Sequence, residues 1–241
     1  MGHKISPISL RMGFTQDWRS RYFAKKDLIK YLKEDTKIRQ ALEKRLRFMS
    51  VANIEIERSP GEIKIIIYTS RPGLIIGRGG AGSDEIKKEM EKAIKSKNSE
   101  GSSRGGTYGA GKIKIEIQEY KNPETSAAIM AEQIIEKIER RMPFRRVLKQ
   151  ALAKIVSSRE VKGAKIEIKG RLDGSEIART EHMEEGLMPL QKLTANIDFA
   201  KNTAYTTYGT VGVKVWIYRN DSDSATNRKR FGGTFDKHAS T

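Results

Sequence analysis

The clearest chemical feature of the chain is a glycine-rich loop, Gly77-Arg78-Gly79-Gly80. It follows the apolar residues 74–76 and precedes an amphipathic segment. Because glycine has no side chain, a backbone built from it can approach a phosphate closely. The N-terminus of a following helix would add free N–H donors and a positive dipole end, and Arg78 adds a cation. The loop therefore predicts a site that binds the phosphates of a nucleotide or of a nucleic-acid backbone.

The same region also fits a dinucleotide-binding fingerprint, because Gly77, Gly79 and Gly82 spell G-x-G-x-x-G. That fingerprint requires a strand that runs directly into the first glycine. Here Ser70–Gly73 separates the preceding strand from the loop, and Pro72 favours a short helix instead. The loop resembles that of a KH domain, which clamps about four nucleotides by their backbone. We therefore favour this interpretation over a nucleotide-dependent oxidoreductase.

Other signs of enzyme chemistry are weak. Residues 106–112 resemble the P-loop of an NTPase, but Ile113 stands where serine or threonine would hold Mg²⁺. The 3 histidines lie far apart, and the absence of cysteine excludes disulfides, zinc ribbons and thiol catalysis. Carboxylates gather at 181–185, where we expect a surface strand end or ion-pair partners for arginines rather than acid–base chemistry. We expect a protein that is not an enzyme and that uses no metal or cofactor.

A run of basic residues in the second half is the next candidate site. Glu139 is the only acid in a cluster of cations: Lys137, Arg140, Arg141, Arg145, Arg146, Lys149 and Lys154. Pro143 should begin a helix in which Lys149 is four residues from Arg145 and three from Arg146, so these cations should share a face. The opposite face is apolar: Phe144, Val147, Leu148, Ala151, Leu152 and Ile155. A helix face that only contacts solvent would carry acidic residues among the basic ones. The near absence of acidic residues here favours contact with RNA.

The composition also points to a polyanionic partner. The 241 residues carry a formal net charge of +17, and the pI is about 9.9. Such an excess of positive charge is typical of proteins that bind nucleic acid or anionic membranes. No apolar run approaches the roughly 18 residues of a membrane-spanning helix, and residues 1–13 lack the apolar core of a signal peptide. We expect a nucleic-acid partner, no membrane, no small-molecule substrate and a cytoplasmic location.

The first segment, to about Lys37, mixes cations with aromatic residues: Lys4, Arg11, Arg19, Arg21, Lys25 and Lys26 with Phe14, Trp18, Tyr22 and Phe23. Such a segment can lie along RNA, with cations on phosphates and rings on bases. It can equally be an arm that packs on its own domain, because aromatic side chains serve both uses. The sequence leaves both possibilities open.

Hydrophobic periodicity predicts the elements that must position these residues. The first half should contain, in order, a helix over roughly 38–48, strands over 54–57 and 63–67, a helix over 83–95 and a strand over 113–117. The second half should contain a helix from Asn122-Pro123 to about Arg141, a second helix to about Ser158, and strands over 166–168, 196–207 and 211–218. Residues 98–111 have the composition of a flexible insertion, and the tail after Asn220 that of a disordered segment.

Several stretches together resemble the bacterial-type small-subunit ribosomal protein S-three family over about residues 1–219. They are Met1–Lys4, Arg11–Gly13, Arg71–Gly77, Glu139–Arg141 with Phe144–Arg146, Gly170–Glu181, Thr206–Gly209 and Gly212–Ile217. The stretch Gly170–Glu181 is the most specific, whereas the glycine loop alone is not specific. The sequence departs from the family's pattern in the insertion, in the tail and at Asp173, where the family often has glycine.

The resemblance implies an α+β fold. A type II KH domain, with the order α-β-β-α-α-β, would be followed by a family-specific α/β C-terminal domain with a mixed or antiparallel sheet. The expected parts are a basic N-terminal arm and helix over 1–37, the KH domain over 38–120, the C-terminal domain over 121–219 and a basic tail over 220–241.

The resemblance also implies a place in the ribosome. The chain would bind ribosomal RNA in the lower head of the small subunit, beside small-subunit ribosomal proteins ten and fourteen, and contact mRNA where it enters. Family residues associated with mRNA at that point match Arg145, Arg146 and Lys149. Ribosomal RNA contacts are expected from Lys4, Arg11, Arg19, Arg140, Arg141, Arg171 and Arg179. The alternatives are a free KH-type regulator of mRNA and, for the origin of the chain, an organelle genome.

Overall fold

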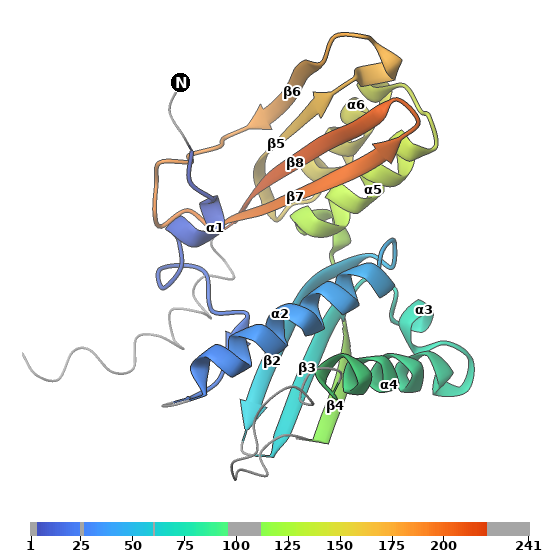
Figure 1. The fold of residues 1–241 in the computed structure, drawn as a ribbon. Helices are drawn as coiled ribbons and strands as arrows, with labels where there is room; N and C mark the ends of the chain where they lie inside the picture. The colour runs from blue at the N-terminus through green and yellow to red at the C-terminus, as the bar shows by residue number, and fades with distance from the viewer. Residues whose placement is uncertain (1–3, 25–26, 60, 96–111, 221–241) are drawn as a thin grey trace, which may run out of the picture. The chain divides into compact units, whose positions relative to one another are not determined.

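The computed structural model describes residues 4–24, 27–59, 61–95 and 112–220 (Figure 1). They form two compact units. One comprises the described part of Arg19–Pro123, and the other combines the described parts of Met1–Trp18 and Glu124–Thr241. Each unit is a four-stranded sheet with helices packed on it and a core of its own. The insertion expected at 98–111 and the tail after Asn220 lie outside the described residues.

The first unit has the element order of a type II KH domain. After the short strand β1 (Ser20–Arg21), its elements are α2 (Leu28–Arg45), β2 (Val51–Ser59), β3 (Glu62–Thr69), α3 (Pro72–Ile76), α4 (Ala81–Lys95) and β4 (Lys112–Glu119). The strand order is β1-β2-β3-β4; β2 and β3 are antiparallel, whereas β1 with β2 and β3 with β4 are parallel. The predicted order α-β-β-α-α-β is therefore confirmed, and this sheet is mixed.

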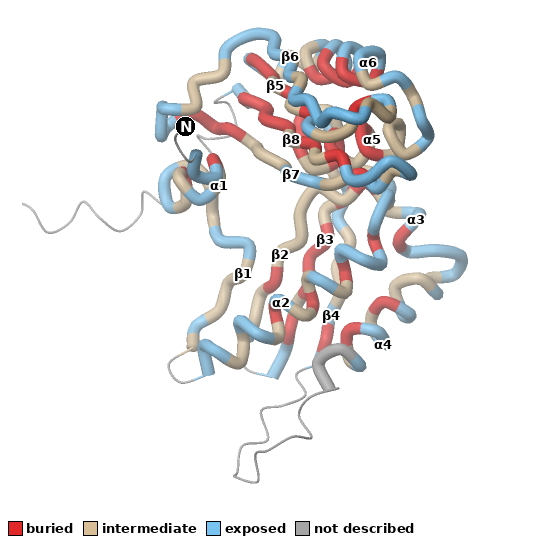
Figure 2. The backbone as a smooth tube through the Cα atoms, turned by 45° about the horizontal axis from the view of Figure 1, so that its top comes forward, coloured by how far each residue is buried: buried red, intermediate tan, exposed pale blue. Residues whose placement is uncertain are grey.

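Alternating isoleucines build the core of this unit. Those of β3 pair in register with those of β4: Ile63 with Ile113, Ile65 with Ile115 and Ile67 with Ile117. Period-2 spacing turns them all to one face of the sheet. Helices α2 and α4 cover that face with apolar side chains: Ile38, Leu42, Leu46, Ile86 and Met90. Figure 2 shows the resulting pattern, with buried positions along the strands and on the sides of the helices that face them.

Helix α2 begins at Leu28 and not near Ile38, where the periodicity predicted its start. The prediction failed because the apolar side chains of the first half are exposed: Leu28, Ile29 and Leu32. Charge anchors that half instead. Arg58 on β2 is paired with Glu34 at 2.7 Å and with Asp35 at 2.6 Å, and the arginine and aspartate side chains are nearly buried. A buried ion pair leaves no hydrophobic periodicity for sequence analysis to detect.

The second unit is a two-layer α/β structure. Its elements are α1 (Pro7–Leu10), α5 (Ala127–Glu139), α6 (Phe144–Val156), β5 (Val161–Gly170), β6 (Arg179–Gly186), β7 (Ile197–Thr206) and β8 (Gly209–Arg219). The strand order is β6-β5-β8-β7, and every pair is antiparallel. Helices α5 and α6 cover one face of the sheet and share its main core (Figures 1 and 2). The expected α/β domain with an antiparallel sheet is confirmed.

Two local predictions for this unit were incomplete. Helix α5 starts at Ala127, because Pro123 opens a separate 3₁₀ turn, Pro123–Thr125. Strand β6 was not predicted beyond a possible strand end at 181–185. It is an edge strand whose side chains are mostly exposed and charged, so it lacks the alternation of apolar residues that reveals a half-buried strand. Among the described residues, no helix is long and apolar enough to cross a membrane.

Arg11 was expected to contact ribosomal RNA, but the structure shows that its side chain is used within the protein. Its side chain is fully buried, and it donates hydrogen bonds to the carbonyl oxygens of Pro7, Leu190, Lys192 and Ala195 at 2.8–3.1 Å. Burial lowers its pKa from the usual value. All three nitrogens of the guanidinium are thus occupied within the protein, where they fasten the N-terminal turn to the segment before β7. Arg11 is not available to RNA.

Candidate nucleic-acid interface

The glycine loop joins α3 to α4 through a short turn, Arg78–Gly80. Its glycines have positive φ angles: 69° at Gly77, 62° at Gly79 and 83° at Gly80. An L side chain is strained in this region, whereas glycine enters it freely. The four predicted loop residues are therefore brought together in a turn whose path depends on glycine.

Gly82, at the start of α4, allows this helix to approach the end of α3. A Cβ at this position would lie 2.5 Å from the carbonyl oxygen of Ile75 and 3.0 Å from that of Ile76. The G-x-G-x-x-G spacing thus serves a turn between two helices. In the described stretch from β3 to α4 no strand runs into Gly77, because α3 intervenes. This is not the context that a dinucleotide-binding loop requires.

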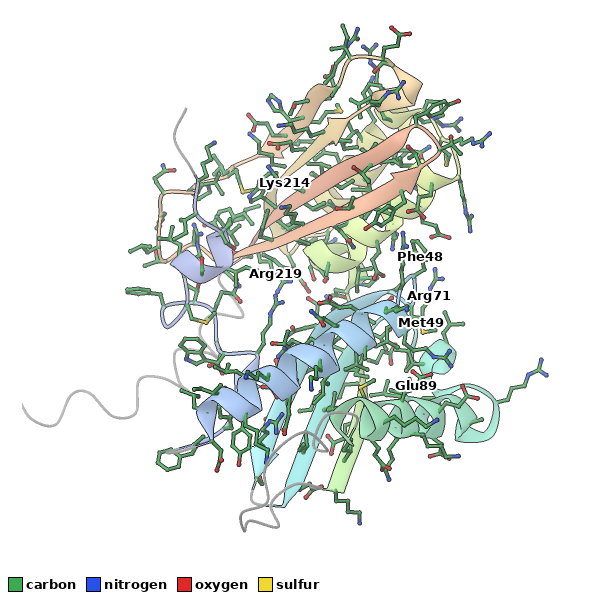
Figure 3. The ribbon with its side chains drawn as sticks, viewed as in Figure 1. Phe48, Met49, Arg71, Glu89, Lys214 and Arg219 are labelled. Carbon is green, nitrogen blue, oxygen red and sulfur yellow. The ribbon has the colours of Figure 1, made fainter. Side chains whose placement is uncertain are left out.

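The surroundings of the loop are both cationic and apolar. Arg78 is exposed, and so is Arg71, immediately before α3 (Figure 3). Leu74 and Ile76 on α3 are 56% and 39% exposed, although Ile75 between them is buried. Phosphates can meet the loop while bases meet the two apolar side chains, as in backbone-clamping RNA domains. Sequence analysis did not assign Leu74 and Ile76 a role. The available signal was an apolar triplet in a short helix, whose successive residues cannot share one face.

Helix α6 has the two faces that its sequence predicted. One is buried against the sheet: Val147, Leu148, Ala151, Leu152 and Ile155. Phe144 is only half-buried and packs at the margin of this core. Arg145, Arg146 and Lys149 are exposed, and within the described ranges of the chain none of them has a carboxylate partner. The packed side therefore fixes the helix while the cations face solvent.

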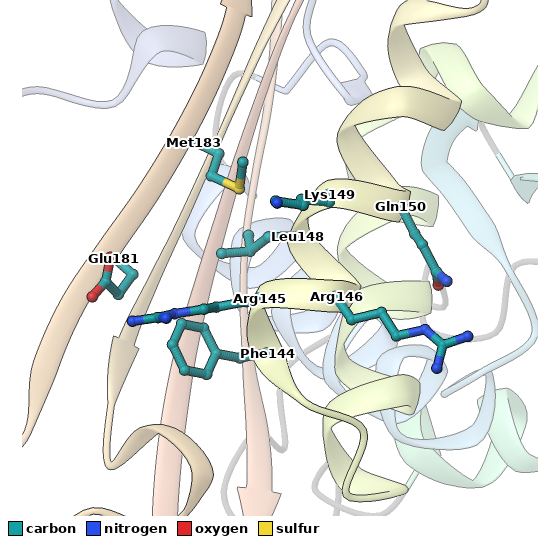
Figure 4. Close-up of a pocket in the computed structure, with 8 residues that line it drawn as sticks. All are labelled: Phe144, Arg145, Arg146, Leu148, Lys149, Gln150, Glu181 and Met183. Atoms are coloured by element: carbon teal, nitrogen blue, oxygen red, sulfur yellow. The ribbon is translucent and has the colours of Figure 1, made fainter.

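The three cations do not all point the same way. Figure 4 shows Arg145 and Lys149 on the side of α6 that faces β6, whereas Arg146 points to the other side, with Gln150. Adjacent residues of a helix are about 100° apart, which separates Arg145 from Arg146. The cationic surface of α6 therefore wraps around the helix and is wider than a single stripe.

Other members of the basic cluster are partly neutralised. Arg140 pairs with Glu136 at 2.6 Å, and Lys154 lies 3.9 Å from Glu124. Both pairs are largely exposed, so each contributes little to stability. Among the described cations of this cluster, those in the first two turns of α6 therefore remain without a carboxylate partner.

Arg141 occupies a position that favours glycine. It follows the C-cap of α5 with φ of 59°. Its N–H donates to the carbonyl of Ile138, and that of Met142 donates to the carbonyl of Lys137, at 2.9 and 3.1 Å. These two bonds define a Schellman motif, whose left-handed residue is usually glycine. A long basic side chain at such a site carries a conformational cost, which makes it a candidate for a functional role.

The remaining predicted contacts are dispersed. Lys4, Arg19 and Arg179 are exposed. Arg171 is half-buried and donates to the carbonyls of Ser175 and Tyr208 at 2.9 and 3.2 Å, so part of its guanidinium is occupied. Lys4, Arg171 and Arg179 belong to the second unit and Arg19 to the first, and they come from separate segments of the chain.

Asp173 also adopts a left-handed conformation, with φ of 51°. Aspartate tolerates this region better than most residues. Its carboxylate accepts a long hydrogen bond, 3.4 Å, from the N–H of Phe144 at the start of α6. Asp173 therefore places an acceptor at a helix N-terminus.

Comparisons with known proteins agree with both units. A model of the KH domain matches residues 37–125. A model described as ribosomal protein S3, C-terminal domain, matches residues 134–217. The class that the two matches define is thus that of ribosomal proteins that carry a KH domain.

Similarity to curated proteins extends over most of the chain. It is 44% identical to small ribosomal subunit protein uS3 of Caldicellulosiruptor saccharolyticus over 92% of this chain and 93% of the relative. The proteins of the same name from Synechocystis sp. and Clostridium botulinum are each 43% identical over 92% of this chain, covering 87% and 93% of the relatives. The chain belongs to the uS3 family of small ribosomal subunit proteins.

Proposed function

We propose that the chain is a structural constituent of the small ribosomal subunit and binds ribosomal RNA without catalysing a reaction. Family membership over 92% of the chain supports this assignment. The KH domain would hold an RNA backbone at Gly77–Gly80, with Arg78 on a phosphate. Exposed cations would add further contacts to ribosomal RNA: Lys4, Arg19, Arg140, Arg141, Arg171 and Arg179.

The α6 surface is the proposed contact for mRNA where it enters the subunit. One observation carries this proposal: Arg145, Arg146 and Lys149 are exposed on a helix whose opposite side is buried, and no carboxylate in the described residues forms an ion pair with them. A rigid cationic surface of this kind attracts phosphates of any sequence. That property suits a strand that must move past the protein.

The resemblance supplies the finer location. We place the chain in the lower head of the small subunit of cytoplasmic ribosomes, beside small-subunit ribosomal proteins ten and fourteen. Functionally, the N-terminal arm and helix would span 1–37, the KH domain 38–120, the C-terminal domain 121–219 and the tail 220–241.

Reconstituted subunits test the division of labour between loop and helix. Arg145→Ala with Arg146→Ala should weaken the hold on mRNA at its point of entrance while incorporation of the protein into subunits stays nearly normal. The matched control is Lys154→Ala, which removes a cation of the same helix that already lies near Glu124. Sedimentation profiles in which the double variant is excluded from subunits would contradict the proposal, because the helix would then serve assembly.

A further inference from the structure

A hollow of about 530 Å³ lies beside the cationic surface of α6. Its lining residues come from α6 and from the edge strand β6: Phe144, Arg145, Arg146, Leu148, Lys149, Gln150, Glu181 and Met183. Figure 4 shows Glu181 and Met183 on β6 across from Phe144, Arg145 and Lys149 on α6. The hollow thus lies within the second unit, next to the residues proposed to hold an RNA strand.

The lining has the components of a site for a planar, polar ring. Phe144, Leu148 and Met183 offer an aromatic and two aliphatic surfaces, and Phe144 and Met183 are only half-buried. The Arg145 guanidinium lies 5.7 Å from the centre of the Phe144 ring, so a cation and an aromatic face border the same space. Aromatic rings and guanidinium planes are the surfaces on which unpaired bases stack.

Glu181 is unexpected on a surface that binds only phosphates. Its carboxylate lines the hollow with Arg145 and Lys149, yet among the described residues it forms no hydrogen bond or ion pair. A carboxylate near a phosphate is repelled by it, so a purely electrostatic surface gains nothing from this residue. A base edge that carries N–H groups does gain, because a carboxylate accepts hydrogen bonds and a guanine Watson–Crick edge presents two adjacent donor groups.

We propose that this hollow receives one unpaired nucleobase, preferably guanine, of a single-stranded RNA whose adjacent phosphates lie against Arg145 and Lys149. The inference rests on the proposed RNA contact of α6 and adds a base site to it. The base would stack on Phe144 and donate to Glu181. Charge favours a nucleotide over a basic peptide as the occupant, because two cations stand beside one carboxylate and would repel lysine or arginine side chains.

Binding of the purified full-length protein, freed of nucleic acid, to labelled single-stranded uridine oligonucleotides tests the base site. One strand carries a single central guanosine and the other an abasic residue at that position. We expect the guanosine strand to bind about tenfold more tightly, the usual range for one stacked base. Glu181→Gln should reduce this preference by the part that the hydrogen bonds of guanine contribute, because the amide offers one acceptor oxygen in place of two. Glu185→Gln should retain it, because Glu185 is on the same strand but outside the hollow.

The outcomes separate the base site from the proposed function. Arg145→Ala should weaken binding of both strands, which reports the phosphate contact. Equal binding of the guanosine and abasic strands by the unaltered protein would overturn the base site and leave the phosphate contact standing. The base site also fails if Glu181→Gln keeps the preference. A lysine-rich peptide that displaces the guanosine strand only when Glu181 is present would overturn it in favour of a protein partner.

Discussion

In the proposed function the glycine loop and the α6 surface would contact RNA by opposite means. In the loop the main chain itself would approach the RNA, and glycine is required because φ is positive and α3 and α4 nearly touch. On α6 the backbone is an ordinary helix, held by a buried side, and the side chains would carry the interaction. The loop should therefore be sensitive to added atoms and the helix to lost charge. Substitutions can test each half of this difference.

The largest expected effect is conformational. Gly82→Ala places a Cβ 2.5 Å from a backbone oxygen that cannot move without displacing α3. We expect the KH domain to lose about 3 kcal/mol of unfolding free energy, within the range for overpacked sites. Gly73→Ala is the control, because a Cβ there meets open space. Chemical denaturation of both variants checks this, and equal stability would show that glycine is not needed for the approach.

The next effect concerns charge on α6. Replacing Arg145, Arg146 and Lys149 by alanine should leave the fold intact because all three side chains are exposed. Each phosphate contact contributes roughly 0.7 to the slope of the logarithm of RNA affinity against the logarithm of salt concentration. If each of the three side chains contacts one phosphate, the slope should become shallower by about 2 in the triple variant. Titrations at several salt concentrations measure this slope. An unchanged slope with weaker binding would mean that the helix acts through shape and not through charge.

Arg141 should be sensitive both to backbone conformation, like the loop, and to loss of charge, like α6. Arg141→Gly should raise the unfolding free energy by about 1 kcal/mol, because glycine relieves the left-handed strain. The same change should weaken RNA binding a few-fold, by roughly the loss of one phosphate contact. Arg140→Gly is the control, since its φ is −78° and no strain is relieved. Higher stability without any loss of affinity would remove Arg141 from the interface.

The smallest effect is a shared response to acid. A hydrogen bond from Lys64 lowers the pKa of Glu116 in the first sheet, and one from Lys165 lowers the pKa of Glu184 in the second. A lowered carboxylate pKa adds stability above the unfolded pKa, and this stability is lost as pH falls through the folded pKa. Because both pairs are partly exposed, the change should be slight. Melting temperatures of Glu116→Gln and the unaltered chain should differ at pH 7 and converge in acid; a difference that persists in acid would contradict the mechanism.

Whether an element could be predicted from the sequence depended on the interaction that stabilises it. Isoleucine alternation and proline and glycine positions predicted the KH order and the helices of the second unit, because these elements bury regular apolar faces. The first half of α2 and strand β6 were missed, because an ion pair with Arg58 and an exposed sheet edge produce no such pattern.

The candidate site was also predicted only in part. The near absence of acidic residues predicted that α6 would expose its cations, and the spacing of the glycines predicted the loop. Arg11 looked like any other cation of the first segment, and only the carbonyls brought to it from Leu190, Lys192 and Ala195 show that it is buried. The hollow beside α6 depends on Glu181 and Met183 from a strand distant in sequence, so no local pattern could reveal it.

Photocrosslinking of the nucleic-acid-free protein to single-stranded RNA at low ionic strength, followed by peptide mapping, tests the central claim most directly. We predict adducts in peptides that contain the Gly77–Gly80 loop and in peptides that contain the start of α6, and loss of both as salt is raised. Adducts confined to other surfaces, or no binding of RNA at all, would contradict the claim. The claim is that the backbone of the glycine loop and the unpaired cations of α6 bind the RNA strand.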